Sequence, residues 1–399
     1  MNFVFISPNF PEAYRWFCIR LWENGVNVLG VGDTSYDALH PDLKRALSEY
    51  YRVDSLEDYD QVLRALGYFT GQYGKIDWVE SNNEYWLELD AQLRTDFNIT
   101  TGLKFQQIDR IKSKIAMKEF YKKAGLPCAR YAPVTDLEAG LAFAHEVGYP
   151  IIVKPDNGVG AIATWKLKND GEMAEFFQDP PPVPYLMEEF ISGHVTTYDG
   201  ICNSRGEVLF AASHITRNSI MEMVTDHVPT YYYVDKEVPA DVEAAGKATL
   251  KAFGVYSRFF HLEFFRLTEA KPGLGDVGDI VALEVNMRPA GGYTPDMLNF
   301  GQSVDVYQIW ADMVAFDELR HEYTGPHSYC IYAGRRDENH YVLTLPQLEA
   351  RCGTHARLFT RMPDALAGTM GNQVAIACFD TLPEVENFVQ SAFQLEDEA

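Results

Sequence analysis

Two segments in the second half of the chain alternate apolar and polar residues with a period of two, which predicts β-strands. The first segment, 259–267, is expected to place one apolar set on a single face, namely Phe260, Leu262 and Phe264. The second segment, 279–292, is expected to do the same with Val281, Leu283, Val285 and Met287. A Gly-rich link joins the two segments, so we expect the strands to pair as antiparallel neighbours.

The opposite faces of these two strands carry polar groups that a buried strand usually avoids. Pairing would bring Glu263 beside Glu284 and Asn286, and Arg288 follows at the end of the second strand. Two carboxylates crowded on one face repel each other and cost desolvation energy. A divalent cation removes both penalties, and Mg²⁺ prefers hard oxygen ligands together with phosphate oxygens. The pattern therefore predicts a magnesium–nucleotide site held by Glu263, Glu284 and Asn286.

A Gly-rich turn lies between two apolar segments in 148–167 (GYPIIVKPDNGVGAIATWKL). The first segment ends at Lys154, and the turn contains Gly158 and Gly160. The backbone N–H groups of such a flap are suited to line a phosphate. A structural hairpin would use the same turn, but a lysine that closes a buried strand needs an anionic partner.

The secondary structure predicted near the N-terminus differs from that predicted near the C-terminus. Strands and helices alternate in residues 1–107, which predicts an open α/β domain. A basic amphipathic helix is predicted over Asp109–Ala124. Residues 323–399 are expected to form a small C-terminal α+β lobe. The predicted fold class is α/β plus α+β.

Composition narrows the partners and the compartment. The 399 residues are 47% hydrophobic, as expected for a globular chain of two or three domains. The formal charge of −23 argues against nucleic-acid and anionic-membrane partners, which need clustered Lys and Arg. The six cysteines are scattered, no apolar run approaches membrane-spanning length and no signal peptide is recognisable, so we expect a cytoplasmic protein.

Other common nucleotide and hydrolase motifs have little support. Residues 273–278 match G-x-G-x-x-G, but they precede a strand instead of opening a helix, so we interpret them as a hairpin loop. The sequence lacks a Walker P-loop, an H-E-x-x-H motif and a G-x-S-x-G elbow. Zinc-protease and serine-hydrolase chemistry are therefore disfavoured.

Taken in order, the segments IIVKPDNGVGA, LMEEFISGH, HLEFF and LEVNMRPAGG resemble the ATP-grasp superfamily, with the resemblance covering about residues 1–320. The order of parts is similar to that of biotin carboxylase, carbamoyl-phosphate synthase and ligases that join amino acids. The resemblance implies a small subdomain with the flap (108–186) and a central subdomain with the metal site (187–322), which grip ATP between them.

The resemblance also implies roles for individual residues, with ATP and Mg²⁺ as cofactors and Mn²⁺ as a substitute metal. Catalytic roles would fall to Arg288, which would face the transferred phosphoryl group, and to Lys154. The phosphates would lie between Lys114, Lys154 and the turn formed by Asp156, Gly158, Gly160 and Ala161. Adenine would be framed by Glu188, Glu189 and Ile191. Many relatives contact the ribose with a glutamate where this chain has His194, so the ribose contact departs from the usual pattern.

The expected reaction uses ATP to activate a small-molecule carboxylate as an acyl phosphate, which an amine then attacks, with amino acids as one substrate class. Residues expected to affect specificity are Arg217, Glu222, His227, Arg288, Gly291 and Gly292. Two alternatives remain open: an enzyme that activates bicarbonate, and a nucleotide-binding protein without catalysis. A homodimer is left open as a further partner.

Overall fold

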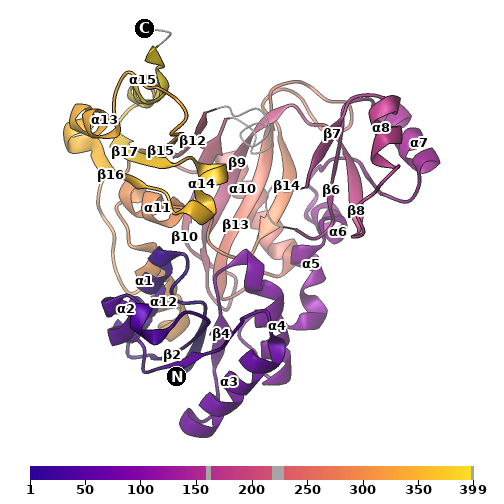
Figure 1. Ribbon diagram of the computed structural model, residues 1–399. Coiled ribbons are helices and arrows are strands. Elements are labelled where there is room, and N and C mark those ends of the chain that lie inside the picture. The colour runs from indigo at the N-terminus through magenta and orange to yellow at the C-terminus, as the bar shows by residue number, and fades with distance from the viewer. Residues whose placement is uncertain (159–162, 218–228, 397–399) are drawn as a thin grey trace.

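The computed structural model describes residues 1–158, 163–217 and 229–396 (Figure 1). Within these residues three sheets organise the chain: a four-stranded parallel sheet near the N-terminus, a four-stranded antiparallel sheet and a nine-stranded antiparallel sheet. Figure 1 shows the nine-stranded sheet in the middle, with the N-terminal sheet below it and the smaller antiparallel sheet to one side. None of the described helices combines the length and the apolar composition needed to cross a bilayer.

The N-terminal domain is the open α/β unit that the sequence predicts. Its strands are β1 (Asn2–Ile6), β2 (Asn27–Gly32), β3 (Glu49–Arg52) and β4 (Trp78–Glu80), in the order β3-β2-β1-β4. Its helices are α1 (Arg15–Glu23), α2 (Pro41–Ala46), α3 (Tyr59–Tyr73) and α4 (Leu87–Asp96), with short 3-10 turns η1 (Glu12–Tyr14), η2 (Tyr36–Ala38), η3 (Glu84–Trp86) and η4 (Phe105–Gln107). Helix α3 begins where the Asp58 side chain accepts the backbone N–H of Gln61, and it buries Val62, Leu66 and Phe69.

The smaller antiparallel sheet has the strand order β5-β8-β6-β7. This region consists of α5 (Asp109–Lys112), α6 (Lys114–Ala124), β5 (Tyr131–Pro133), α7 (Leu137–Val147), β6 (Ile151–Pro155), β7 (Trp165–Leu167), α8 (Asp170–Phe176) and β8 (Tyr185–Glu189). The single helix predicted over Asp109–Ala124 is divided at Ser113, whose extended backbone ends α5. The Ser113 side chain caps α6 by accepting the N–H of Ala116, so that Lys114 becomes the first residue of the second helix.

The nine-stranded sheet joins the predicted central subdomain to the C-terminal lobe. Its strands are β9 (Gly193–Cys202), β10 (Val208–Ala212), β11 (His214–Thr216), β12 (Thr230–Val234), β13 (Arg258–Leu267), β14 (Ile280–Asn286), β15 (Tyr329–Arg335), β16 (Ala356–Arg361) and β17 (Gln373–Phe379). The accompanying helices are α10 (Ala240–Phe253), α11 (Thr294–Gln302), α12 (Val306–Phe316), α13 (Leu345–Cys352), η5 (Gly353–His355), α14 (Asp364–Met370) and α15 (Leu382–Phe393). Because β15 pairs with β12, one sheet crosses the boundary expected near residue 323.

The two predicted acidic strands are β13 and β14, and they pair as antiparallel neighbours as expected. The apolar face expected on β13 is also found, because Phe260, Leu262 and Phe264 pack in one core cluster. The single apolar face expected on β14 is wrong: Val281 lies opposite Phe265, whereas Val285 lies opposite Leu262 on the other side of the sheet. The cause is a β-bulge, since Glu263 and Phe264 pair with Glu284 and Ala282 and the intervening Leu283 has no partner.

A buried ion cluster connects the N-terminal domain to the acidic hairpin. The Oε2 atom of Glu80, at the end of β4, accepts hydrogen bonds from Arg94 Nη2 at 2.8 Å and Arg258 Nη2 at 2.9 Å. All three side chains are almost fully buried. Burial opposes ionisation of Glu80, but Arg258 and Arg94 outweigh it and hold the pKa of this carboxyl below its ordinary value. The hairpin is therefore fixed at its base by charges from another domain.

We expect Glu80→Gln to lower the free energy of unfolding by about 3–5 kcal/mol, because it leaves two buried guanidinium groups without their carboxylate. Urea unfolding followed by tryptophan fluorescence measures the loss. Asp337→Asn is the control, since its pair with Arg361 is exposed and is expected to contribute little. Equal midpoints for Glu80→Gln and the wild type would contradict this role of the cluster.

Candidate active site

The acidic hairpin brings the three predicted metal ligands onto neighbouring positions of one sheet face. Glu263 on β13 lies directly opposite Glu284 on β14, and His261 lies opposite Asn286. Paired residues on antiparallel strands share a face and have closely spaced Cβ atoms. The Glu263 and Glu284 side chains are 15% and 20% exposed, so both remain within reach of a ligand. Two carboxylates and an amide oxygen form an all-oxygen donor set that fits Mg²⁺.

Each of these three side chains already contacts a cationic or hydrogen-bonding side chain. Lys114 Nζ lies 3.1 Å from Glu284 Oε1, and His261 Nε2 lies 2.9 Å from Glu263 Oε1. The Asn286 side-chain oxygen accepts a hydrogen bond from Arg288 Nη2 at 3.2 Å. Burial opposes ionisation of Glu263, but His261 and Arg288 outweigh it and lower the pKa of the carboxyl. The carboxylate is therefore kept in the form that binds a metal.

A second charge cluster lies on the smaller sheet. Lys154 Nζ, at the end of β6, is 2.5 Å from Glu188 Oε2, and Lys118 of α6 contacts the other carboxylate oxygen. Burial is outweighed by Lys118 and Lys154, which lower the pKa of Glu188 to about 2. For Lys154, burial is outweighed by Glu188 and Glu284, so its pKa lies above the ordinary value. Lys118 was not among the predicted site residues, although it follows Lys114 by four residues and so shares its helix face.

Of the residues expected to form the flap, Asp156 contacts the start of α6 and Gly158 contacts Lys114. The carboxylate of Asp156 faces α6, because Oδ1 accepts the N–H of Ile115 at 2.8 Å and Oδ2 accepts the Ser113 hydroxyl at 2.8 Å. Its side chain therefore anchors the start of α6 instead of turning toward the flap. The carbonyl of Gly158 accepts a hydrogen bond from Lys114 Nζ at 3.2 Å. Gly160 and Ala161 lie outside the described residues.

The segment expected to frame adenine leads from the smaller sheet into β9. The Glu189 carboxylate accepts the backbone N–H of Arg130 at 2.7 Å and its guanidinium at 2.8 Å, so this side chain is occupied. Ile191 is buried in a small apolar cluster. His194 lies opposite Arg266 on β13, and burial, with further contributions from Arg217 and Arg266, lowers its pKa. His194 is therefore placed as a neutral ring at the start of β9.

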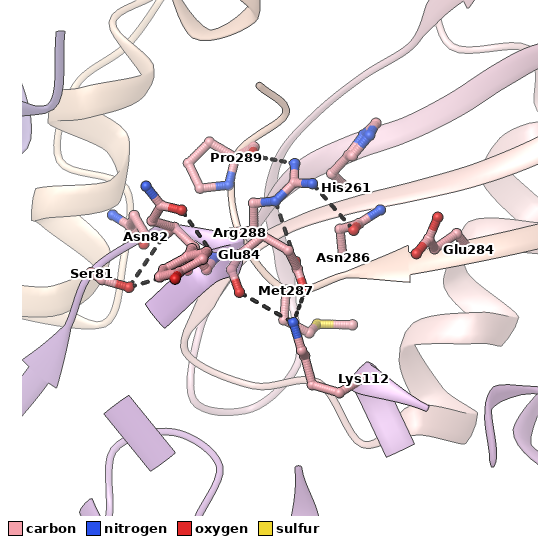
Figure 2. Close-up of polar contacts among 12 residues, drawn as sticks. Ser81, Asn82, Glu84, Lys112, His261, Glu284, Asn286, Met287, Arg288 and Pro289 are labelled. Atoms are coloured by element: carbon pink, nitrogen blue, oxygen red, sulfur yellow. Dashed lines mark hydrogen bonds and ion pairs between the residues drawn. The ribbon is translucent and has the colours of Figure 1, made fainter. Parts of the chain in front are cut away.

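Arg288 links the hairpin to the N-terminal domain (Figure 2). Its Nη1 donates to the Pro289 carbonyl at 2.8 Å, and its Nε lies 3.3 Å from Glu84 Oε2. Glu84 Oε1 in turn lies 2.8 Å from Lys112 Nζ. In Figure 2, Asn286 and Glu284 lie on one side of Arg288 and Glu84 on the other.

Neither Glu84 nor Lys112 was among the site residues predicted from the sequence. A signal was available for Glu84, because it ends a polar run that follows β4. The carboxyl ends of strands in an open α/β sheet are where ligands usually bind.

The residues expected to affect specificity are only partly brought to this site. Arg217 lines a cavity of about 220 Å³ with Tyr233 and residues of α15. That cavity lies on the opposite face of the sheet from Glu263, because Ile215 pairs with Thr196 whereas Glu263 pairs with Thr197. Arg217 therefore lies away from the three predicted metal ligands, and its role in specificity stays a prediction.

The remaining specificity candidates fall in two places. Gly291 and Gly292 form the turn between Arg288 and α11, and Gly292 has a φ of +62°, which favours glycine. Glu222 and His227 lie outside the described residues.

Comparisons with known proteins agree with this architecture. The family model described as the ATP-binding domain of the carbamoyl-phosphate synthase L chain matches residues 109–180. The chain is 25% identical over 324 residues to the L-arginine-specific L-amino acid ligase of Bacillus subtilis, an alignment that covers 77% of this chain and 74% of that protein.

Two solved structures show the shared fold. The L-amino acid ligase from Bacillus licheniformis matches with a TM-score of 0.72 and 15% identity, over 100% of this chain and 97% of that one. The biotin carboxylase domain of the Hydrogenobacter thermophilus 2-oxoglutarate carboxylase, solved with MgADP and bicarbonate, matches with a TM-score of 0.65 and 16% identity, over 98% and 89%.

We expect Lys118→Met to make the protein less resistant to acid. The lowered pKa of Glu188 adds stability above its ordinary value of 4.5, and this stability is lost as the pH falls toward about 2. Removing one cation raises the pKa of Glu188, and each unit of increase removes about 1.4 kcal/mol at neutral pH. Acid titration followed by tryptophan fluorescence should show unfolding at a higher pH. Lys122→Met, at an exposed position of the same helix, should match the wild type, and the same midpoint for both variants would contradict the expectation.

Proposed function

We propose that this protein, which has the ATP-grasp fold, is an ATP-dependent ligase that joins a carboxylate to an amine and releases ADP and phosphate. The proposal depends on one observation: oxygen groups that can bind a metal lie close to lysine side chains that can bind phosphate. Glu263, Glu284 and Asn286 supply metal-binding oxygens from one sheet. Lys114 and Lys154 supply cations near these oxygens, because Lys114 contacts Glu284 and the charge of Glu284 also raises the pKa of Lys154.

These residues suit a triphosphate held with a divalent cation. When bound, Mg²⁺ would neutralise charge on the β and γ phosphate oxygens. Lys114 and Lys154 are now balanced by carboxylates, and phosphate oxygens would offer them alternative anionic partners. Glu188 keeps Lys118 as a buried partner, so Lys154 is able to turn to a phosphate without leaving that carboxylate unpaired. Phosphate binding to Lys154 therefore does not leave the buried Glu188 carboxylate without a cationic partner.

We propose that Arg288 acts on the group that is transferred. It extends from the end of the metal-binding strand, and Glu84 and Asn286 hold its guanidinium from two sides. A fixed guanidinium stabilises charge that develops on a phosphoryl group. In the proposed reaction a carboxylate oxygen attacks the γ-phosphorus, and the bond to ADP breaks. The amine then attacks the acyl carbon, phosphate leaves with the bonding electrons, and the amine loses a proton.

Amino acids are the substrate class that we propose. The support comes from the Bacillus subtilis relative, which is named as an L-arginine-specific L-amino acid ligase. Bicarbonate activation is the second candidate, and the likeness to a biotin carboxylase domain solved with bicarbonate favours it. All six cysteines are free, which suits a reducing cytoplasm, and a homodimer stays a prediction.

We expect ADP release to require Mg²⁺, a carboxylate and an amine, and Glu284→Gln to abolish it, because the variant loses one anionic ligand of the metal. A coupled ADP assay over pairs of amino acids measures this. Glu243→Gln is the control, since Glu243 forms an exposed pair on α10 and should leave turnover unchanged. ADP release with bicarbonate alone would favour the second candidate. Normal turnover of Glu284→Gln would show that the metal assignment is wrong.

We expect Arg288→Ala to lower kcat by about 10²–10³-fold and to change the KM for ATP far less, because the guanidinium acts on charge that develops in the transition state. Steady-state kinetics at varied ATP separates the two parameters. Arg205→Ala, at an exposed arginine of the β9–β10 turn, is the matched control. Equal losses in kcat and in ATP affinity would point to nucleotide binding alone.

A further inference from the structure

A series of buried hydrogen bonds leads from Glu263 through His261 to Asp199. Asp199 of β9 lies opposite His261 of β13, and its Oδ1 is 2.6 Å from His261 Nδ1. The other ring nitrogen, Nε2, is 2.9 Å from Glu263 Oε1. Asp199 is fully buried and His261 is 5% exposed. One imidazole therefore connects a buried carboxylate to a proposed metal ligand.

The far end of this chain is fixed by two further side chains. Asp199 Oδ2 accepts the Thr197 hydroxyl at 2.6 Å and lies 2.7 Å from His214 Nδ1. The rings of His214 and His261 stack with centroids 5.4 Å apart and an angle of 14° between their planes. These contacts leave the Asp199 carboxylate and the His261 ring little freedom to rotate.

The partners of His261 hold its ring in one orientation. Nδ1 lies 2.6 Å from Asp199 Oδ1 and Nε2 lies 2.9 Å from Glu263 Oε1, so the ring spans the two carboxylates. A carboxylate oxygen accepts hydrogen bonds, and the ring nitrogen that faces Glu263 is therefore the donor.

Asp199, His214 and His261 also resemble a metal-binding set, because their ligand atoms lie within 4.8 Å of one another. Hydrogen bonds account for the short contacts, however, since each Nδ1 is directed at a different oxygen of Asp199. His261 Nε2 is also occupied by Glu263. These three side chains are therefore better suited to orient a ligand of the neighbouring metal site than to bind a metal ion themselves.

We propose that Asp199 and His261 are positioning residues that determine which oxygen of Glu263 is offered to the metal, an inference that rests on the proposed function. The Nε2 hydrogen of His261 occupies Oε1 and blocks rotation of the carboxylate. Oε2 then remains as the oxygen for the metal. Partners of this kind orient metal ligands, and losing one typically costs about 10–100-fold in metal affinity.

The test measures Mn²⁺ binding in the presence of ADP, by electron paramagnetic resonance of the free ion, and needs no turnover. His261→Asn places its amide near the Nδ1 position, where it reaches Asp199 but not Glu263, and we expect about 10–100-fold weaker binding. His261→Gln places a donor near the Nε2 position, and we expect it to restore most of the affinity. Asp199→Asn keeps the volume and removes the charge that orients the ring, so we expect about tenfold weaker binding.

Asp312→Asn is the matched control, because Asp312 is also a fully buried aspartate and lies 2.9 Å from a histidine ring nitrogen, in His321. It is expected to lose stability and to bind Mn²⁺ as the wild type does. Wild-type affinity in both His261→Asn and Asp199→Asn, or an equal loss in Asp312→Asn, would overturn the proposal.

Glu284→Gln separates this inference from the proposed function. If Glu284→Gln loses Mn²⁺ while His261→Asn keeps it, the metal site stands and the positioning role fails. If Glu284→Gln binds Mn²⁺ normally, the metal site itself is wrong, and the positioning role falls with it.

Discussion

Buried carboxylates that touch cations from other elements connect the N-terminal domain to the acidic hairpin and β8 to α6. Glu80 ends β4 and contacts Arg258 at the start of β13. Glu84 contacts Arg288 just after β14, so the N-terminal domain contacts both strands of the acidic hairpin at the base opposite its turn. Glu188 joins β8 to α6 in the same manner. A buried charge is costly unless it is paired, and these pairs therefore fix the geometry of the layers even where their net contribution to stability is small.

The same arrangement suits a site that must bind a highly charged ligand. The carboxylates of the hairpin and the lysines that face them are already desolvated, and their charges are balanced without a nucleotide. A metal and a phosphate chain would replace one set of ionic partners by another, with little new charge to bury. Charged groups that are fixed in advance cost little reorganisation when a reaction develops charge.

The sequence revealed what depends on short-range pattern. The two acidic strands, their antiparallel pairing and the closeness of Glu263 to Glu284 follow from alternation and a short link. The bulge at Leu283 did not follow, because a period of two carries no mark of an extra residue. Contacts that join distant segments depend on how domains pack, as for Glu84 with Arg288, or on which strands pair, as for Asp199 with His261. No local pattern reports that packing.

The central sheet is completed late in the chain. Strand β12 has β11 on one side, but its other edge is covered only by β15, whose residues come about a hundred positions later. During synthesis on the ribosome, residues 230–234 therefore emerge well before their partner exists. An uncovered strand edge pairs readily with other chains. The nascent protein thus carries an open edge at β12 until β15 has been translated.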